Sequence, residues 1–195
     1  MRWISGIVVV AVALIVVYYG SAFYSLSQLL AATRAGDGAA IVARTDLPRL
    51  SRSLSEQIVN AYLDRISAAR RVGTMERMLV GSYGATVADV LVAKMLTSEN
   101  LTQLLTSGQF SETPGKPLIS KLPSLTDLQR INVVTQFGRM HFINPVKLSI
   151  RVSKAADPEQ ATSIVLHRSS LTWKLAGIEL PRALVRDIAA TLPAR

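Results

Sequence analysis

The chain has 195 residues, a formal net charge of +9 and no cysteine. Without cysteine, neither a disulfide framework nor a thiolate metal site is available, and stability has to come from packing. The basic residues are spread along the chain, and no aromatic residues interleave with the adjacent pair Arg70-Arg71. This pattern argues against nucleic acid as a partner, whereas a basic surface near a bilayer would attract anionic headgroups.

The first element is an apolar stretch from Trp3 to Tyr24 that contains no charged residue. At about 1.5 Å per residue, a helix over this stretch covers the roughly 30 Å of hydrocarbon in a bilayer. Rings that favour the headgroup level stand at both ends of it. We therefore predict a transmembrane signal anchor over residues 1–24, with the lipid bilayer as its partner. The predicted membrane-interface residues are Trp3, Tyr18, Tyr19, Phe23 and Tyr24.

A cleavable signal peptide is the alternative for this stretch. The aliphatic run Ile7 to Val17 has the length of its apolar part, and Gly20-Ser21-Ala22 offers small residues for cleavage. Against cleavage, bulky aromatic residues flank these positions, and helical spacing continues from Ser25 to Ala35. We favour a retained anchor. The flanking basic residues are nearly balanced, with Arg2 on one side and Arg34 and Arg44 on the other. A very short N-terminal tail before a long domain with few charges near the membrane resembles an export signal, so we expect a single-pass protein of the cytoplasmic (inner) membrane with its C-terminal domain in the periplasm.

Residues 25–108 have the periodicity of helices. Helix-breaking glycine residues follow Arg34, so the first helix should end there. Asp37 is placed to cap a short helix from Ala39 to Ala43. The next helix begins either at Asp46, with Pro48 in its first turn, or later at a capping box formed by Ser53 and Glu56. Its apolar stripe is Leu47, Leu50, Leu54, Ile58, Ala61 and Ile66. Further helices are expected after Thr86 and from Ser98, the latter with Leu101, Leu104 and Leu105 on one face.

The composition of residues 109–125 predicts a loop, after which the period of apolar residues changes to two. Residues 126–181 should form an antiparallel meander, and residues 182–195 a tail that could be helical. The clearest strand alternates Val146, Leu148, Ile150 and Val152 with polar residues. The other three expected strands are Ile131–Phe142, Ser163–Arg168 and Leu171–Leu180. The predicted fold class is α+β, in which an N-terminal transmembrane helix precedes one domain, residues 25–195, with several helices packed on one face of an antiparallel sheet of about four strands.

Two passages carry a resemblance to a known family: LSQLLAATRAGDGAAIVARTDLPRLSRSLSEQI from Leu26, and LTWKLAGIELP from Leu171. Together with the apolar leader, they resemble the bacterial membrane-anchored family catalogued as domain of unknown function 2939. The matching positions are Asp46, Leu47, Pro48 and Leu50 at a helix start, and Trp173, Leu180 and Pro181 at the closing strand. The chain departs from the family pattern at Ser21-Ala22-Phe23 and in its tail after Pro181. The family has no assigned reaction, so the resemblance implies an architecture and no catalytic residues.

We find no motif in the sequence that marks a catalytic, cofactor-binding or metal-binding site. His141 and His167 lack neighbouring acidic residues at metal-ligand spacing, and no nucleophile elbow or phosphate-binding glycine loop occurs. We therefore assign no catalytic, cofactor-binding or metal-binding residues and no cofactor. Asp46 is interpreted as a helix cap, and Trp173 as a core residue with the wall of an apolar pocket as the alternative.

Two functions from different classes remain open at this stage. The leading one is a non-enzymatic, membrane-anchored envelope module that binds or scaffolds an apolar ligand or a partner protein, with an envelope protein or a lipid as its partner. The alternative is a small envelope enzyme of unassigned reaction. A pocket in which Asp, His and Tyr converge would favour the enzyme.

Overall fold

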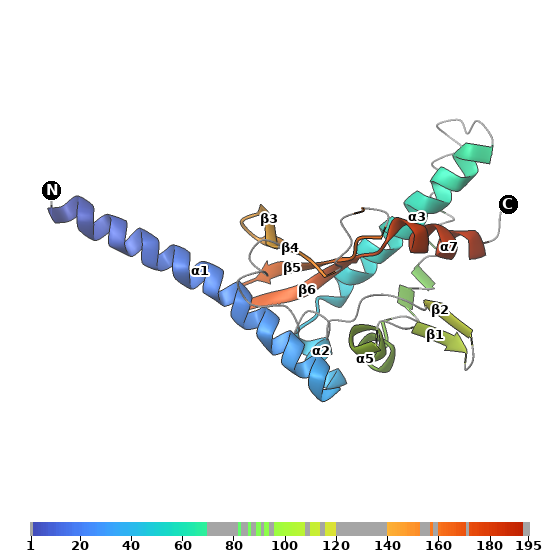
Figure 1. Cartoon of the computed structure of the whole chain (residues 1–195), viewed down its shortest axis with the longest axis horizontal. Coiled ribbons are helices and arrows are strands. Elements are labelled where there is room, and N and C mark those ends of the chain that lie inside the picture. Colours follow the sequence, from blue (N-terminus) through green and yellow to red (C-terminus); the bar gives the residue numbers. More distant parts are fainter. Residues whose placement is uncertain are drawn as a thin grey trace.

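The computed structural model describes residues 2–69, 82, 86, 89–90, 92–93, 96–107, 110–113, 116–119, 140–152, 157, 160–170 and 172–192, a few of them by backbone alone. A single long helix, α1 (Arg2–Ala35), starts the chain. Its N-terminal half projects away from the other elements, and its C-terminal half lies beside the sheet (Figure 1). Of the helices in the described part of the chain, none is both long and apolar enough to cross a membrane.

The helical boundaries follow the local signals of the sequence. Gly36 adopts a positive φ of 63°, which glycine tolerates without strain, and α1 ends just before it. The carboxylate of Asp37 accepts a hydrogen bond from the amide of Ala40 at 2.9 Å and begins α2 (Gly38–Ala43). The carboxylate of Asp46 accepts one from the amide of Arg49 at 3.2 Å. Therefore α3 (Leu47–Ala69) starts at the earlier of the two expected positions.

The apolar stripe of α3 enters the core as its spacing predicts. Leu50, Leu54, Ile58 and Ile66 are buried, and Tyr62, which the predicted stripe omitted, is buried with them. The helix α5 (Ser98–Ser107) likewise buries the three predicted leucines, Leu101, Leu104 and Leu105. The expected helix after Thr86 falls largely outside the described residues.

The predicted meander is confirmed as a four-stranded antiparallel sheet. The strands β3 (Met140–Asn144), β4 (Lys147–Arg151), β5 (Ser163–Ser169) and β6 (Thr172–Glu179) follow one another in chain order. Leu148, Ile150 and Val152 are buried as the alternation requires. Val146 departs from the prediction, because the chain reverses there between β3 and β4 and leaves this side chain 43% exposed. Of the expected strand Ile131–Phe142, the part before Met140 lies outside the described residues.

The loop predicted over residues 109–125 is wrong in part. The strands β1 (Phe110–Thr113) and β2 (Lys116–Ile119) pair antiparallel there and form a second, two-stranded sheet. The sequence between the two strands is Pro114-Gly115, a pair typical of tight turns, and short strands on either side of such a pair form a hairpin. The residues of the expected tail form α7 (Arg182–Thr191), which packs against α3.

The outer edge of β6 is covered by segments from the helical half. The connector between α2 and α3 pairs with it: the amide of Asp46 donates to the carbonyl of Leu175 at 2.7 Å, and the amide of Leu175 donates to the carbonyl of Arg44 at 2.9 Å. An open strand edge is a template for pairing with other chains, so this cover protects the sheet from aggregation.

The side chain of Gln57 covers the next part of the same edge. Its amide nitrogen donates to the carbonyl of Ile178 at 2.8 Å, and its amide oxygen accepts from the amide of Leu180 at 2.9 Å. One glutamine thus replaces the two backbone partners that a fifth strand would have supplied. Close to this point, a Cβ added at Gly177 would lie 3.0 Å from the hydroxyl of Ser53, so the small residue lets α3 approach β6.

Candidate functional site

The first candidate site is the region where α1 changes from an exposed rod into a packed helix. The large aliphatic side chains described before Tyr18 are all more than half exposed, and they are Ile7, Val8, Val9, Val10, Val12, Val16 and Val17. From Ala22 onward the helix buries one face against the domain, through Ala22, Leu26, Leu29 and Ala32. The helix is continuous through the change, so exposed and packed residues belong to one rigid element.

Aromatic rings gather at this change and join α1 to the sheet. The ring of Tyr18 lies edge-on to that of Trp173, with centroids 5.7 Å apart, and the ring of Tyr19 lies edge-on to that of Phe142 at 4.7 Å. Such edge-to-face pairs are favourable because the positive edge of one ring meets the negative face of the other. The guanidinium of Arg168 lies 4.9 Å from the centroid of Tyr18 and adds a cation–π contact.

Two serines of α1 hold Trp173 by hydrogen bonds. The indole nitrogen of Trp173 donates to the hydroxyl of Ser21 at 3.1 Å, and its backbone amide donates to the hydroxyl of Ser25 at 3.2 Å. Trp173 is 3% exposed, which agrees with its interpretation as a core residue. Cleavage within Gly20-Ser21-Ala22 would remove Ser21 or separate it from the rest of the packed helix.

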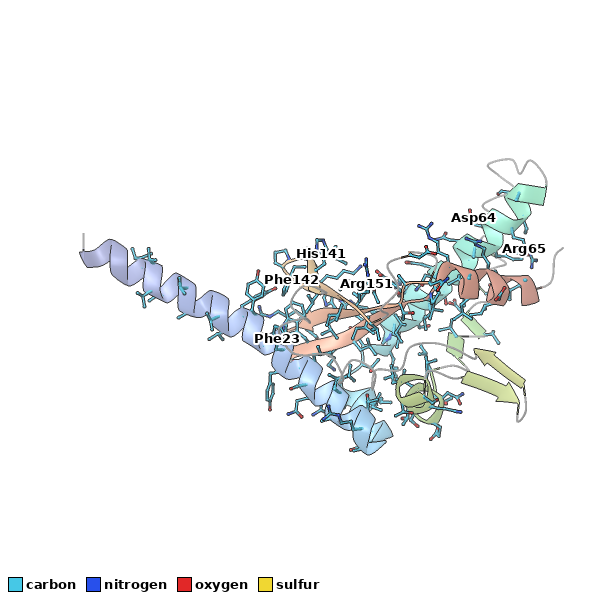
Figure 2. All side chains as sticks on the ribbon, viewed as in Figure 1. Phe23, Asp64, Arg65, His141, Phe142 and Arg151 are labelled. Carbon is cyan, nitrogen blue, oxygen red and sulfur yellow. The ribbon has the colours of Figure 1, made fainter. Side chains whose placement is uncertain are left out.

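The predicted membrane-interface residues differ in how far they are exposed to solvent. The rings of Tyr18 and Tyr19 contact rings of the sheet and are also partly exposed to solvent. Tyr24 is 67% exposed. Phe23 is half-buried near the junction of helix and sheet (Figure 2). The side chain of Trp3 lies outside the described residues. No local pattern in the sequence indicates that Tyr18 and Trp173, more than 150 positions apart, are in contact.

The second candidate site is a polar cleft of about 1000 Å³ between α3, α7 and one end of the sheet. Figure 2 shows Asp64 and Arg65 on α3 and Arg151 on the sheet side. Its charged lining consists of Asp64, Arg65, Arg151, Glu179, Arg182 and Arg186. The described lining contains no histidine or tyrosine, so the convergent cluster that would favour an enzyme is not found in this cleft.

Arg65 has a structural role inside this cleft. Its guanidinium donates to the carbonyls of Ala189 at 2.7 Å and Leu192 at 3.0 Å, at the C-terminal end of α7. Carbonyls at a helix end lack partners within the helix and carry partial negative charge, so a cation there is favourable. The cleft is therefore a polar surface that could accept polar or charged groups, and part of its lining holds α7 in place.

A smaller hollow of about 390 Å³ lies along α3 and is lined by Asp89 and polar residues of the helix. There the hydroxyl of Ser55, buried at 6% exposure, donates to the carboxylate of Asp89 at 2.6 Å. This bond satisfies a buried hydroxyl and fixes the segment that carries Asp89 against α3. We assign it to packing.

The two histidines and Asp46 line neither of these two hollows. His141 is exposed on β3, and the Nδ1 of His167 on β5 is buried without a hydrogen-bond partner among the described residues. In the same part of the chain, no three His, Asp or Glu side chains converge as a metal site. Asp46 caps α3. Burial alone would raise the pKa of Asp46, but its hydrogen bonds with Arg49 and the charge of that guanidinium hold the pKa below its ordinary value.

Taken together, these features define an α+β protein in which one long helix links an exposed apolar segment to the domain. A family model described as protein of unknown function (DUF2939) matches residues 11–104. Over this segment, the chain is similar to the family of unknown function that its sequence resembles. The match runs from the exposed half of α1 to α5, so the second resembling passage, which includes Trp173, lies beyond it. No curated protein and no solved structure matches the chain.

Proposed function

We propose that the protein is a membrane-anchored module of the bacterial envelope, with the N-terminal half of α1 inserted in the cytoplasmic membrane and the domain on the periplasmic side. The observation that carries this proposal is the run of more than half-exposed aliphatic side chains from Ile7 to Val17. Some side chains of the uncharged stretch lie outside the described residues, so the proposal rests on its sequence and on the exposure of those that are described.

Lipid is the environment that this half of the helix fits best. Each fully buried Val or Ile side chain contributes about 1.5 to 3 kcal/mol when it leaves water, so seven of them favour insertion by on the order of 10 kcal/mol. A contiguous apolar surface of this size on an element that projects from its domain is typical of an interaction site. The uncharged sequence around it and the rings at Tyr18 to Tyr24 favour a bilayer over a protein groove.

Within this proposal, the domain acts as a non-enzymatic binding or scaffolding module. The space between α3 and the sheet is filled by buried side chains, among them Leu54, Ile58 and Ile178. The cleft between α3, α7 and the sheet is lined by six charged side chains, four of them arginines. The sequence left two kinds of binding partner open, an apolar ligand and a partner protein. The filled space between the layers and the charged cleft therefore favour a polar partner, such as an envelope protein, over an apolar ligand held between the layers.

Membrane association can be tested by carbonate extraction of the full chain. We expect the protein to stay in the membrane fraction, because an inserted helix buries far more apolar area than a peripheral contact. The matched variant Val9→Lys with Val12→Lys places two charges in the exposed half and leaves the packed half unchanged; it should move to the soluble fraction. Extraction of the unaltered chain to the same extent as this variant would refute the proposal.

A further inference from the structure

The end of the sheet that faces α1 carries an exposed apolar turn. The turn between β3 and β4 and the turn between β5 and β6 lie at the same end, since Lys147 pairs with His167 and Ser169 pairs with Thr172. At the first of these turns, Ile143 is 47% exposed and Val146 is 43% exposed. They are the large apolar side chains of the described sheet that are most open to solvent.

This turn is fixed next to the residues at which α1 leaves its exposed half. The amide of Arg168 donates to the carbonyl of Val146 at 2.8 Å, and the guanidinium of the same arginine lies against the ring of Tyr18. On β3, Phe142 packs against both Tyr18 and Tyr19. Figure 2 shows Phe142 and Phe23 close to the place where α1 meets the sheet. The turn therefore cannot move far from Tyr18 along the helix axis.

The length of the anchor determines how deep this end of the sheet lies. A helix needs about 20 residues to cross about 30 Å of hydrocarbon, and a span that starts at Trp3 leaves the hydrocarbon near Ala22. The segment from Tyr18 to Ala22 already packs against the sheet. The helix can therefore span the hydrocarbon and keep Tyr18 to Ala22 packed against the sheet when this end of the sheet lies at the level of the lipid headgroups.

The charge of this end suits an anionic headgroup layer. Lys147, His167 and Lys174 are neighbours in the register of β4, β5 and β6 and form a basic row across the sheet next to the two turns. Arg168 follows His167 along β5. Neither 140–152 nor 163–175 contains an aspartate or glutamate. Basic groups behind an apolar tip are the pattern expected for a contact with an anionic membrane surface.

We propose that the β3–β4 turn, through Ile143 and Val146, inserts into the headgroup region of the same bilayer that holds α1. This second contact rests on the proposed function, because it requires the anchor to be in the membrane. The partner is an anionic lipid surface. With two points of contact, the domain is docked on the membrane in one orientation and does not swing on a single helix.

The absence of native cysteine allows a direct test in the full chain. Single cysteines introduced as Val10→Cys, Val146→Cys and Ala190→Cys are labelled with an environment-sensitive fluorophore and reconstituted in vesicles of phosphatidylethanolamine and phosphatidylglycerol. Quenching is then measured with lipids that carry a spin label near the headgroup or deep on the acyl chain. Ala190 is exposed on α7, at the opposite end of the domain, and provides the matched control.

We expect the label at position 146 to be shifted to the blue and quenched most by the shallow spin label, while the label at position 190 is quenched by neither. Quenching at position 146 no greater than at position 190, with strong deep quenching at position 10, would overturn the second contact and leave the anchor standing. A blue shift at position 146 without lipid quenching would mean that the turn docks on protein, which also overturns it. Absence of quenching at position 10 would overturn the anchor itself.

Discussion

Trp173 links α1 to the sheet through its indole bond to Ser21 and its ring contact with Tyr18. Trp173→Phe keeps an aromatic ring but removes the indole donor, and it should lower the free energy of unfolding by about 1 to 2 kcal/mol. Trp173→Ala should cost roughly 3 to 5 kcal/mol because a large buried ring is lost. Urea unfolding in detergent provides the measurement, with the exposed Tyr24→Phe as control. Identical midpoints for Trp173→Phe and the unaltered chain would contradict this role.

The alternation of β4 predicts opposite effects for neighbouring residues. Ile150 is 1% exposed, so Ile150→Asp places an unpaired charge in the core and should destabilise by several kcal/mol, on the order of 3 or more. Ser149→Asp lies on the other face, half-buried, and should cost less than about 1 kcal/mol. Thermal unfolding followed by circular dichroism would compare them. If the two variants lose equal stability, the register described here is incorrect.

The capping carboxylate of Asp46 predicts a pH dependence with a definite sign. Its pKa is held below the ordinary value in the folded state, so its charge stabilises the fold above the unfolded-state pKa, and this stabilisation is lost as pH falls through the folded-state pKa. Asp46→Asn keeps a cap acceptor but removes the charge. The unaltered chain should exceed the variant by less than about 1 kcal/mol at neutral pH, since Arg49 is half exposed. In denaturant titrations, this excess should begin to shrink below about pH 4 and disappear once the pH is below the folded-state pKa of Asp46; an excess that does not shrink as the pH falls through this range would refute the electrostatic cause.

At the scale of elements, the cover of β6 depends on one side chain from α3. Gln57→Met keeps the length of the side chain and removes both hydrogen bonds, which leaves the carbonyl of Ile178 and the amide of Leu180 without these partners. The expected loss is about 1 to 3 kcal/mol in unfolding experiments, together with a greater tendency to aggregate because the strand edge opens. Gln103→Met, on the exposed face of α5, is the matched control and should change neither property. Equal behaviour of the two variants would show that Gln57 does not hold the edge.

The elements that the sequence predicts well are those with a strong local signal. The caps at Asp37 and Asp46, the leucine stripe of α5 and the meander follow from periodicity and from side chains that bond their own backbone. The hairpin of β1 and β2 was predicted as a loop, because its strands are short and its composition is that of turns. The contacts of Gln57 with β6 and of Tyr18 with Trp173 join positions far apart in the sequence, and no local pattern encodes such pairings. The polar cleft was likewise not predictable, since its arginines come from three separate segments.

At the scale of the whole molecule, α1 joins an exposed apolar segment to the packed domain by one continuous helix. Its first half exposes aliphatic side chains, and its second half is a packed part of the domain. Because no break separates the two halves, the direction of the exposed half is fixed relative to the domain, and the rings of Tyr18 and Tyr19 lie where the two halves meet. The polar cleft lies between α3, α7 and the end of the sheet opposite the β3–β4 turn, where Arg151, Ser163 and Glu179 are neighbours in register.

In the proposed function, the first half of α1 lies in lipid while the second half lies outside the membrane on the periplasmic side. This arrangement is tested most directly by the reaction of a membrane-impermeant maleimide with single cysteines at Val10 and at Arg34 in cells whose outer membrane has been permeabilised. We predict that Arg34→Cys is labelled in these cells, whose inner membrane is intact, and that Val10→Cys is labelled only after denaturation. Equal labelling of the two positions would contradict insertion, and labelling of Arg34→Cys only after lysis would place the domain on the cytoplasmic side.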